Sequence, residues 1–309
     1  MGMLVDGRWQ SEEVRRTNAS GEFVRTESPY RNIVSQSNVQ FPVEKDRYHL
    51  FVNAGCPWAY RTILYRSIKH LAPYISVSYT LPAMGNEGWT FSDQGEPLLA
   101  AKHIHNVYSA ADNNFTGRCT VPVLWDKSAD TIVNNESADI IRIFDSEFDH
   151  LDGVVPTRYY PVKHAAEIDR LNERIYRTVN NGVYRCGFAQ SQEAYDQAFE
   201  LLFATLDELD ETLGRQRYLC GDEITEADWR LFATLVRFDV AYYSQFRCNK
   251  RRISDYQYLW PYTRDLYQQP DVAETVDVEA IKGIYFGGRP PHIIPKGPEL
   301  DFTAAHYRD

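Results

Sequence analysis

One cysteine stands where an apolar segment gives way to a helical one, and its neighbours favour a reactive thiol. Cys56 follows the segment "RYHLFVN" and is followed at once by Pro57. Proline suits the first position of a helix, because its missing N–H would have no partner there. The thiol would therefore face the free N–H groups and the positive end of the helix dipole, which lower a thiol pKa. Arg61, one turn further on, would add to this effect. We interpret Cys56 as a nucleophile rather than a buried, inert cysteine.

The chain lacks the second cysteine that a dithiol redox motif would place close to Cys56. Ala59 occupies that position. A mixed disulfide on Cys56 must then be opened by another thiol, and a small external thiol such as glutathione is the economical choice. The cysteine count is odd and no two cysteines form a C-x-x-C pair, which disfavours a secreted disulfide framework and favours the cytoplasm. The other four are Cys119, Cys186, Cys220 and Cys248.

Two further segments could hold a small thiol peptide. In "TVPV", a proline that opens a strand would leave the backbone of Val121 available to pair with an extended peptide, although such a proline also has an ordinary structural explanation. In "NNESADII", Glu136 and Ser137 stand at a predicted helix start, where free N–H groups would receive a carboxylate and Glu136 an ammonium group. Arg118 could pair with a second carboxylate. Simple helix-start residues remain the alternative for the second segment.

The elements that must position these residues follow from periodicity. The segments 47–53 and 74–82 are predicted strands with a helix over 57–71 between them, which implies a right-handed parallel pairing. Residues 82–118 are rich in glycine and are predicted to be loops. Two strands at 120–125 and 131–133 and an amphipathic helix over 136–148 follow. The order βαβ…ββα is typical of a thioredoxin-like fold.

The character of the sequence changes after a linker at 152–161. From there to about residue 270 the period is helical, and Thr225 with Asp228 forms a capping box that serves folding rather than chemistry. From Gly283 onward, the content of proline and glycine predicts no regular structure. We therefore predict an α/β domain joined to an all-α domain, divided into an extended arm over 1–45, a thioredoxin-like glutathione-binding domain over 46–155, an all-helical domain over 160–285 and an irregular C-terminal tail over 286–309.

Composition and charge exclude several classes of function. The formal net charge of the 309 residues is −10, which disfavours non-specific binding to nucleic acid or to an anionic membrane. No apolar run approaches the length of a membrane span, and the N-terminus lacks the apolar core of a signal peptide. We therefore expect neither a nucleic-acid partner nor a membrane.

Several long motifs resemble one known family. "NAGCPWAYR", "GWTF", "TVPVLWDK", "NNESADIIRIF", "NNGVYRCGFAQSQEAYDQA" and "RFDVAYYSQFRCN" are similar to the glutathionyl-hydroquinone reductases, also called Xi-class glutathione transferases. The resemblance extends from about residue 3 to residue 300. It implies a thioredoxin-like domain followed by an all-helical domain, in a homodimer built largely from the helical domains.

The resemblance also implies an activity and a set of site residues. Cys56 would attack the sulfur of a glutathionyl-hydroquinone, release hydroquinone and leave a disulfide with glutathione, which a second glutathione would open. Glutathione is then a co-substrate, and neither metal nor nucleotide is expected. The glutathione site implied by the family comprises Trp89, Arg118, Val121, Glu136 and Ser137, and the tyrosines on the quinone side are Tyr184, Tyr242 and Tyr285.

The sequence departs from the family in places, and other functions stay open. The position four after the cysteine is usually His and is Tyr60 here, while the tail "GIYFGGRPPHIIPKGP" differs around Tyr285, which bears on the preferred quinone. A conjugating glutathione transferase is the second hypothesis, although such enzymes activate glutathione with a serine or tyrosine hydroxyl. A non-enzymatic module that uses this fold for protein assembly is the third.

Overall fold

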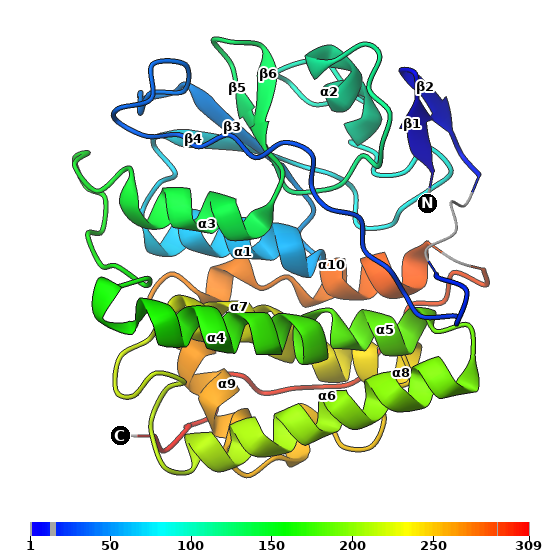
Figure 1. Cartoon of the computed structure of the whole chain (residues 1–309), viewed down its shortest axis with the longest axis vertical. Coiled ribbons are helices and arrows are strands. Elements are labelled where there is room, and N and C mark those ends of the chain that lie inside the picture. Colours follow the sequence, from blue (N-terminus) through cyan, green and yellow to red (C-terminus); the bar gives the residue numbers. More distant parts are fainter. Residues whose placement is uncertain (1, 13–16, 289, 309) are drawn as a thin grey trace. The chain divides into compact units, whose positions relative to one another are not determined.

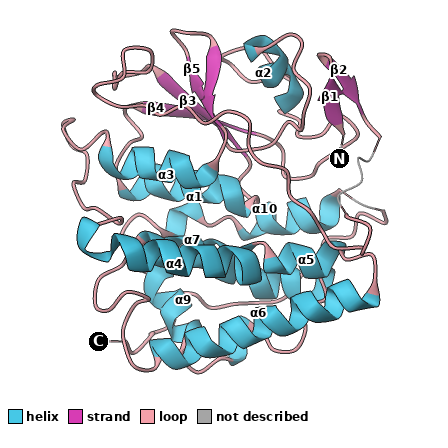
Figure 2. Ribbon diagram, viewed as in Figure 1, coloured by secondary structure: helices cyan, strands magenta, loops and turns pink. Residues whose placement is uncertain are grey.

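The computed structural model describes residues 2–12, 17–288 and 290–308, which divide into two compact units. The first unit contains residues 2–12, 27–157 and 279–294 without 289, and the second contains 17–26, 158–278 and 295–308. The break at residues 157 and 158 falls inside the linker expected from the sequence. Figure 2 shows that the four-stranded sheet belongs to the first unit, whereas helices dominate the second.

The sheet of the first unit has the order β4-β3-β5-β6. β3 (Tyr48–Val52) pairs in parallel with β4 (Ile75–Tyr79), and their connection is helix α1 (Pro57–Ile68). β5 (Val123–Asp126) pairs antiparallel with both β3 and β6 (Thr131–Asn134). β3 is buried along its whole length, as its apolar run predicts. The βαβ…ββα arrangement and the thioredoxin-like fold are thereby confirmed.

Helices α1, α2 and α3 accompany this sheet. α1 packs against α3 (Ser137–Ser146), and the two lie together on one side of the sheet (Figure 1). α2 (Ile104–Ala111) packs near β6. α2 corrects the prediction of loops over residues 82–118, because its own segment, between Gly95 and Gly117, contains no glycine. Its start is stabilised by Asn106, whose side-chain oxygen accepts the N–H of His103 at 3.0 Å.

The N-terminal segment was expected to be an extended arm, but its first part forms a hairpin. β1 (Met3–Val5) pairs antiparallel with β2 (Arg8–Gln10). Leu4 exchanges two backbone hydrogen bonds of 2.9 Å with Gly117, which ties the hairpin to the first unit. Residues 17–26 belong instead to the second unit, where the carbonyl of Gly21 accepts the N–H of Gln190 at 2.9 Å.

The second unit is helical, as the period after residue 160 predicts. Its capping box at α7 is confirmed: the N–H of Thr225 donates to Asp228 at 2.7 Å. The buried Asp228 also accepts from the hydroxyl of Tyr262 at 2.8 Å. The α-helices are α4 (Ala165–Ile175), α5 (Gly182–Phe188), α6 (Gln192–Leu213), α7 (Glu226–Arg237), α8 (Tyr243–Gln245) and α9 (Leu259–Tyr267), with π-helical turns at Tyr176–Asn180 and Phe238–Tyr242 and 3₁₀ turns at Val162–His164, Ile253–Asp255 and Ala273–Thr275.

The prediction that regular structure ends at Gly283 is wrong. α10 (Val278–Lys282) continues into a π-helical turn at Gly283–Gly287. A Cβ on Gly283 would lie 2.5 Å from the Cβ of Pro82, so glycine is needed here for close packing rather than for breaking a helix. Glycine content alone therefore gave a misleading signal in this segment.

The last part of the C-terminal tail, residues 295–308, is irregular but packed within the second unit. Phe302 is buried and stacks on Tyr267, with ring centroids 5.0 Å apart. The guanidinium of Arg308 donates to the carbonyls of Leu213 and Arg217, at 3.2 and 2.5 Å. The tail therefore contributes to the stability of the helical unit although it forms no helix.

A buried histidine in β3 makes the stability of the first unit depend on pH. His49 is 4% exposed, and burial lowers its pKa to about 4, with Lys127 and Arg66 adding to the effect. Its ring nitrogens lie 2.7 and 3.0 Å from the hydroxyls of Ser76 and Ser78. As the pH falls below about 6.5, His49 becomes protonated in the unfolded chain. In the folded chain it stays neutral until the pH reaches about 4, so the folded state loses stability over this range.

We expect the free energy of unfolding to fall by about 3 kcal/mol between pH 6.5 and pH 4 on account of His49. Urea unfolding of the His49→Gln variant across this range should lack that part of the slope. The same change at the exposed His150 serves as the matched control. If the free energy of unfolding fell with pH by the same amount in the wild type and in His49→Gln, His49 would not be the cause of the pH dependence.

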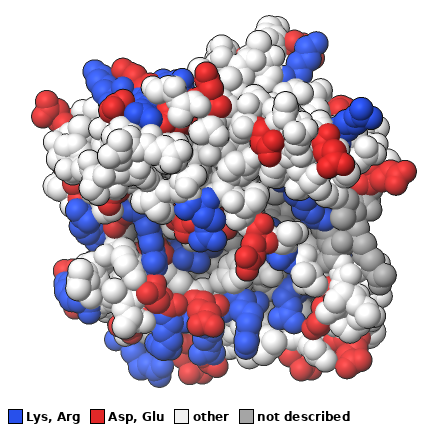
Figure 3. Space-filling model, turned by 45° about the horizontal axis from the view of Figure 1, so that its top comes forward, with Lys and Arg blue, Asp and Glu red and all other residues white. Residues whose placement is uncertain are grey.

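Charge of both signs is distributed over the surface. The face drawn in Figure 3 shows basic and acidic side chains interspersed, without a continuous basic area. Among the described residues, no helix is long and apolar enough to cross a membrane.

Candidate functional site

The structure places Cys56 at the start of α1, as the sequence predicts. Cys56 has extended backbone angles, with φ −74° and ψ 122°, and occupies the N-cap position, while Pro57 is the first helical residue. Its carbonyl accepts the N–H of Tyr60 at 2.8 Å, which opens the helical hydrogen-bond ladder. The sulfur is therefore attached at the positive end of the helix dipole, which favours a thiolate.

Asn53 anchors the loop that carries the thiol, and the sequence analysis did not single it out. Its side-chain oxygen accepts the N–H groups of Gly55 and Cys56, at 2.9 and 3.1 Å. Its amide nitrogen donates to the hydroxyl of Thr80 at 2.9 Å, at the end of the neighbouring strand β4. An asparagine directly after a strand and two residues before glycine is a turn signal that could have identified it.

The backbone beside the sulfur comes from the segment before β5. The carbonyl oxygen of Val121 lies 4.0 Å from the Sγ of Cys56, and both residues are buried. The peptide bond between Val121 and Pro122 is cis, as expected for a proline at this position of a thioredoxin-like fold. The structure thus brings the predicted nucleophile and one predicted glutathione residue into direct contact.

Glu136 and Ser137 stand at the start of α3, as predicted. Glu136 is the N-cap, and its carboxylate accepts the N–H of Ala138 at 3.1 Å and the hydroxyl of Ser28 at 3.0 Å. The guanidinium of Arg61 reaches from α1 to the hydroxyl of Ser137 at 3.4 Å. Arg61 therefore connects the helix that begins at the thiol with the helix start that is predicted to bind the γ-glutamyl group, a role that its spacing alone did not reveal.

The remaining predicted glutathione residues, Trp89 and Arg118, also lie in the first unit. Trp89 is buried, and its carbonyl accepts the N–H of Ile104 at 2.9 Å, which holds its loop to the start of α2. Arg118 is half-buried and follows Gly117, the residue that pairs with the N-terminal hairpin. One compact unit therefore contains the thiol and all five residues predicted to bind glutathione.

Tyr285 belongs to the same unit as Cys56, although the sequence analysis placed it in the helical domain. It is buried in the π-helical turn that follows α10. The segment that carries it packs on the thiol loop: a Cβ on Gly55 would lie 2.4 Å from the carbonyl oxygen of Ala280 and 2.9 Å from the Cγ2 of Ile284. Only glycine permits this approach of the two backbones.

Tyr184 and Tyr242 lie together in the second unit. Their ring centroids are 6.1 Å apart at an interplanar angle of 59°, and Phe246 packs against both rings, at 5.2 and 5.4 Å. The guanidinium carbon of Arg25 is 5.1 Å from the centroid of Tyr184. Because these two tyrosines and Cys56 belong to different units, their joint participation in one site stays a prediction.

All three predicted tyrosines are associated with π-helical turns. Tyr242 is the last residue of one such turn, Tyr285 is the third residue of another, and Tyr184 follows a third turn by four residues. Short π-helical insertions are rare and occur frequently at functional sites. Tyr242 and Tyr285 share this feature with the aromatic residues Tyr176, Phe238 and Phe286 of the same turns.

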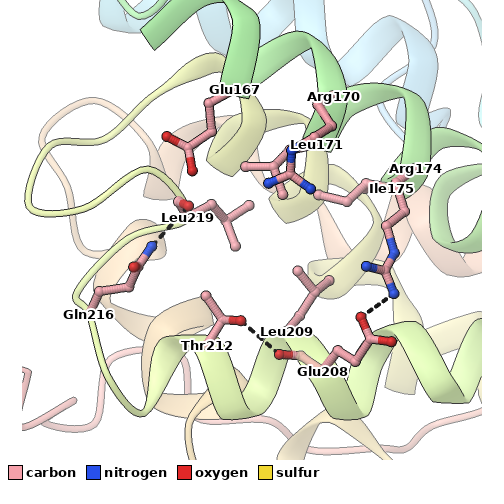
Figure 4. Close-up of a pocket in the computed structure, with 10 residues that line it drawn as sticks. All are labelled: Glu167, Arg170, Leu171, Arg174, Ile175, Glu208, Leu209, Thr212, Gln216 and Leu219. Carbon is pink, nitrogen blue, oxygen red and sulfur yellow. Dashed lines mark hydrogen bonds and ion pairs between the residues drawn. The ribbon is translucent and has the colours of Figure 1, made fainter.

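A pocket of about 170 Å³ lies in the second unit, apart from every predicted site residue. Figure 4 shows the ion pair between Arg174 and Glu208 on one side of it and the side chains of Leu209 and Leu219 facing the same space. Pockets for drug-sized ligands are usually about 300 to 1,000 Å³. This pocket is therefore smaller than a site for a glutathione conjugate requires.

The five cysteines allow a direct test of the predicted thiolate. Cys56, Cys119 and Cys220 are almost equally exposed, at 6, 5 and 7%, but only Cys56 starts a helix. Burial raises the pKa of Cys119 to about 12 and that of Cys220 to about 11, and it also raises the pKa of Cys248. We expect iodoacetamide at neutral pH to modify Cys56 first, as measured by peptide mapping.

Because exposure is matched, a difference in rate between these thiols reports electrostatics rather than access. The midpoint of the rate of Cys56 modification against pH should lie below the value of about 8.5 for a free thiol. Equal rates for Cys56 and Cys119 would contradict the activation of Cys56.

Comparison with known proteins agrees with this geometry. Residues 55–147 match the family model described as the N-terminal domain of glutathione S-transferase, and residues 192–265 match its C-terminal domain. The glutathionyl-hydroquinone reductase YqjG of Escherichia coli K12 is 46% identical over 325 residues, covering 100% of this chain and 99% of the relative. The glutathionyl-hydroquinone reductase PcpF of Sphingobium chlorophenolicum is 46% identical over 306 residues, covering 96% of each.

Solved structures agree equally well. A Xi-class glutathione transferase from Natrialba magadii has a TM-score of 0.94 and 43% identity, covering 100% of this chain and 97% of that one. The glutathione-bound structure of E. coli YqjG has a TM-score of 0.91 and 44% identity, covering 99% of both chains. Together with the thioredoxin-like fold and the cysteine at a helix start, these similarities over the full length show that the chain belongs to the glutathionyl-hydroquinone reductases, the Xi class of glutathione transferases.

Proposed function

We propose that this chain is a glutathione-dependent reductase that removes glutathione from glutathionyl-hydroquinones. The observation that carries the proposal is the position of Cys56 at the start of α1, next to the Val121 backbone and with Ala59 where a resolving cysteine would stand. Such a thiol can form a mixed disulfide with glutathione but cannot resolve it alone. Two curated relatives that carry the name of this activity match the chain over almost its full length.

The reaction proceeds in two thiol exchanges. The Cys56 thiolate attacks the sulfur of the conjugate, an S–S bond forms and the C–S bond to the ring breaks. The ring carbon takes a proton and hydroquinone leaves. A second glutathione then attacks the mixed disulfide, restores Cys56 and departs as oxidised glutathione. The sum is one conjugate and one glutathione giving one hydroquinone and one oxidised glutathione, so the reaction requires neither metal nor nucleotide.

Residues of the first unit bind the peptide part of the substrate in this proposal. Glu136 receives the ammonium of the γ-glutamyl group, and the free N–H groups at the start of α3 with Ser137 receive its carboxylate. The backbone of Val121 pairs with the cysteinyl residue of glutathione, and Arg118 binds the glycyl carboxylate. Trp89 supports this site from its loop.

The three tyrosines bind the quinone part. The hydroxyls of Tyr184, Tyr242 and Tyr285 donate hydrogen bonds to the ring oxygens, which carry negative charge as the C–S bond breaks. The support for this role is the resemblance to the family and, for Tyr242 and Tyr285, their place in π-helical turns. The enzyme acts as a homodimer in the cytoplasm, by analogy with the family and with the reduced state expected of its cysteines.

Product analysis tests the proposed function. The purified full-length chain is incubated with a synthetic glutathionyl-hydroquinone and glutathione, and both products are quantified by chromatography. We expect hydroquinone and oxidised glutathione in equal amounts, and a glutathione adduct on Cys56 when the second glutathione is withheld. Fast conjugation of chloro-dinitrobenzene with negligible hydroquinone release would favour a conjugating transferase instead.

Replacing the tyrosines separates the quinone side from the glutathione side. We expect Tyr184→Phe, Tyr242→Phe and Tyr285→Phe each to lower kcat/KM for the conjugate by about tenfold or more, because each removes a donor to the developing charge. Adduct formation with oxidised glutathione involves no quinone and should be unchanged. Tyr243→Phe, next to Tyr242, is the matched control. Equal losses in both half-reactions would assign the tyrosines a structural role.

A further inference from the structure

Three potential metal ligands meet in the first unit, in a place that the proposed reaction does not use. Glu87 comes from the turn at Gly85–Gly88, and His103 and His105 come from the start of α2. One ligand atom from each of these side chains lies within 4.8 Å of the other two. Two imidazoles and one carboxylate form a common ligand set for zinc and similar divalent metals.

The geometry of the cluster is close to that of a bound metal. The Nε2 of His105 is 3.2 Å from a carboxylate oxygen of Glu87. Around a tetrahedral zinc with bonds of about 2.0–2.1 Å, neighbouring ligand atoms are about 3.4 Å apart. These two atoms therefore already have the spacing of two coordination positions. The ring of His103 stacks on that of His105 with centroids 5.0 Å apart, and its ligand atom lies within 4.8 Å of the other two, so binding of a metal requires the His103 ring to turn.

Neighbouring groups hold the ligands in place. The hydroxyl of Thr90 lies 3.1 Å from the Nδ1 of His103, and when this hydroxyl accepts the Nδ1 proton, the Nε2 of His103 is the nitrogen that would bind a metal. The indole of Trp9 stacks on His105 at 4.6 Å and donates to the carbonyl of Asn86 at 3.1 Å, so it fixes the ring and the turn together. These contacts are of the kind that orient metal ligands in known sites.

We propose that Glu87, His103 and His105 form a site for a divalent transition metal of the zinc class, with water as the fourth ligand. Exposure increases from the buried His105 through the half-buried His103 to the exposed Glu87, so the fourth position opens to solvent. The inference does not depend on the proposed function, because no ligand takes part in the thiol exchange.

The metal site lies between the loop that carries Trp89 and the start of α2. Trp89 is two residues from Glu87, and its carbonyl accepts the N–H of Ile104, which lies between the two histidines. A bound metal therefore connects the loop of Trp89 to the start of α2. Occupation stabilises the loop that is predicted to line the glutathione site.

Asn106 limits the affinity. Its side-chain oxygen accepts the N–H of His103, so its amide nitrogen faces the Nδ1 of His105 at 3.4 Å. A histidine that binds metal through Nε2 carries its proton on Nδ1 and requires an acceptor there. A carboxylate at residue 106 would accept from both histidines and preserve the helix cap. We therefore expect Asn106→Asp to bind metal about tenfold more tightly.

The test is a titration of the reduced, full-length protein with Co²⁺, followed by its visible d–d absorption, and then displacement by Zn²⁺. We expect one ion per chain, spectra without a thiolate charge-transfer band, and a rise in melting temperature with Zn²⁺. His105→Phe retains the aromatic ring beside Trp9, His103→Asn retains a helix-capping side chain, and Glu87→Gln retains the hydrogen bond. Each should weaken binding by about tenfold or more.

The control variant is His150→Asn, which changes an exposed histidine outside the cluster and should bind as the wild type does. Melting curves without metal show whether each variant is folded. A thiolate charge-transfer band would show that a cysteine binds the metal. Equal Co²⁺ affinity in the wild type, His105→Phe and His103→Asn would show that these histidines are not ligands. Both results overturn the proposal, as does the absence of binding at millimolar Co²⁺.

Discussion

The Cys56→Ser variant is expected to lose the release of hydroquinone from a glutathionyl-hydroquinone. The value of kcat/KM should fall about a thousandfold or more, which corresponds to about 4 kcal/mol of transition-state stabilisation. The physical reason is that the first step forms an S–S bond, and a hydroxyl cannot form one. The sulfur stands at the N-cap of α1, 4.0 Å from the carbonyl of Val121, and the four other cysteines are placed elsewhere.

The fold should survive this change, so the loss is attributable to chemistry. Serine is a favourable N-cap residue and the thiol is replaced by a group of similar size. The melting temperature is therefore expected to remain close to that of the wild type, and glutathione binding should persist. Cys119→Ser replaces an equally buried thiol and should retain full turnover. Full activity of Cys56→Ser would refute the proposed mechanism.

The Gly55→Ala variant is expected to lose both stability and activity, although it changes no reactive group. The added Cβ would lie 2.4 Å from the carbonyl oxygen of Ala280. This atom belongs to the backbone of α10, so it cannot move aside without moving the helix. The free energy of unfolding should fall by about 1–3 kcal/mol, as for other forced insertions into packed regions.

Activity should fall further than stability alone requires. The segment that must yield carries Tyr285, and the N–H of Gly55 donates to Asn53, which orients the thiol loop. A displacement of about 1 Å at a catalytic group can cost about a hundredfold in rate. Urea unfolding and kcat/KM measure the two effects separately. Gly85→Ala, which meets nothing within 4 Å, is the control, and identical values for the two variants would contradict the packing argument.

The pattern around the thiol could be predicted because it is local. Only 21 residues contain strand β3, the cysteine, Pro57 and helix α1. The hydrophobic period of each segment predicts the strand and the helix, and Pro57 marks where the helix begins. The same holds for the capping box at Thr225. Glycine content misled in two places. α2 lies between Gly95 and Gly117 in a segment without glycine, and Gly283 is helical with its backbone packed closely on Pro82.

The sequence by itself determined the chemistry: a single thiol at a helix start, without a resolving partner, in a chain with the motifs of one glutathione-dependent family. Only the tertiary structure decided what surrounds that thiol. It joined the segment of Tyr285 to the thiol loop through Gly55, placed Arg61 against Ser137, and gathered Glu87, His103 and His105 into one cluster. The physical reason is that periodicity and capping act over a few residues, whereas these contacts arise when distant segments bury their surfaces together.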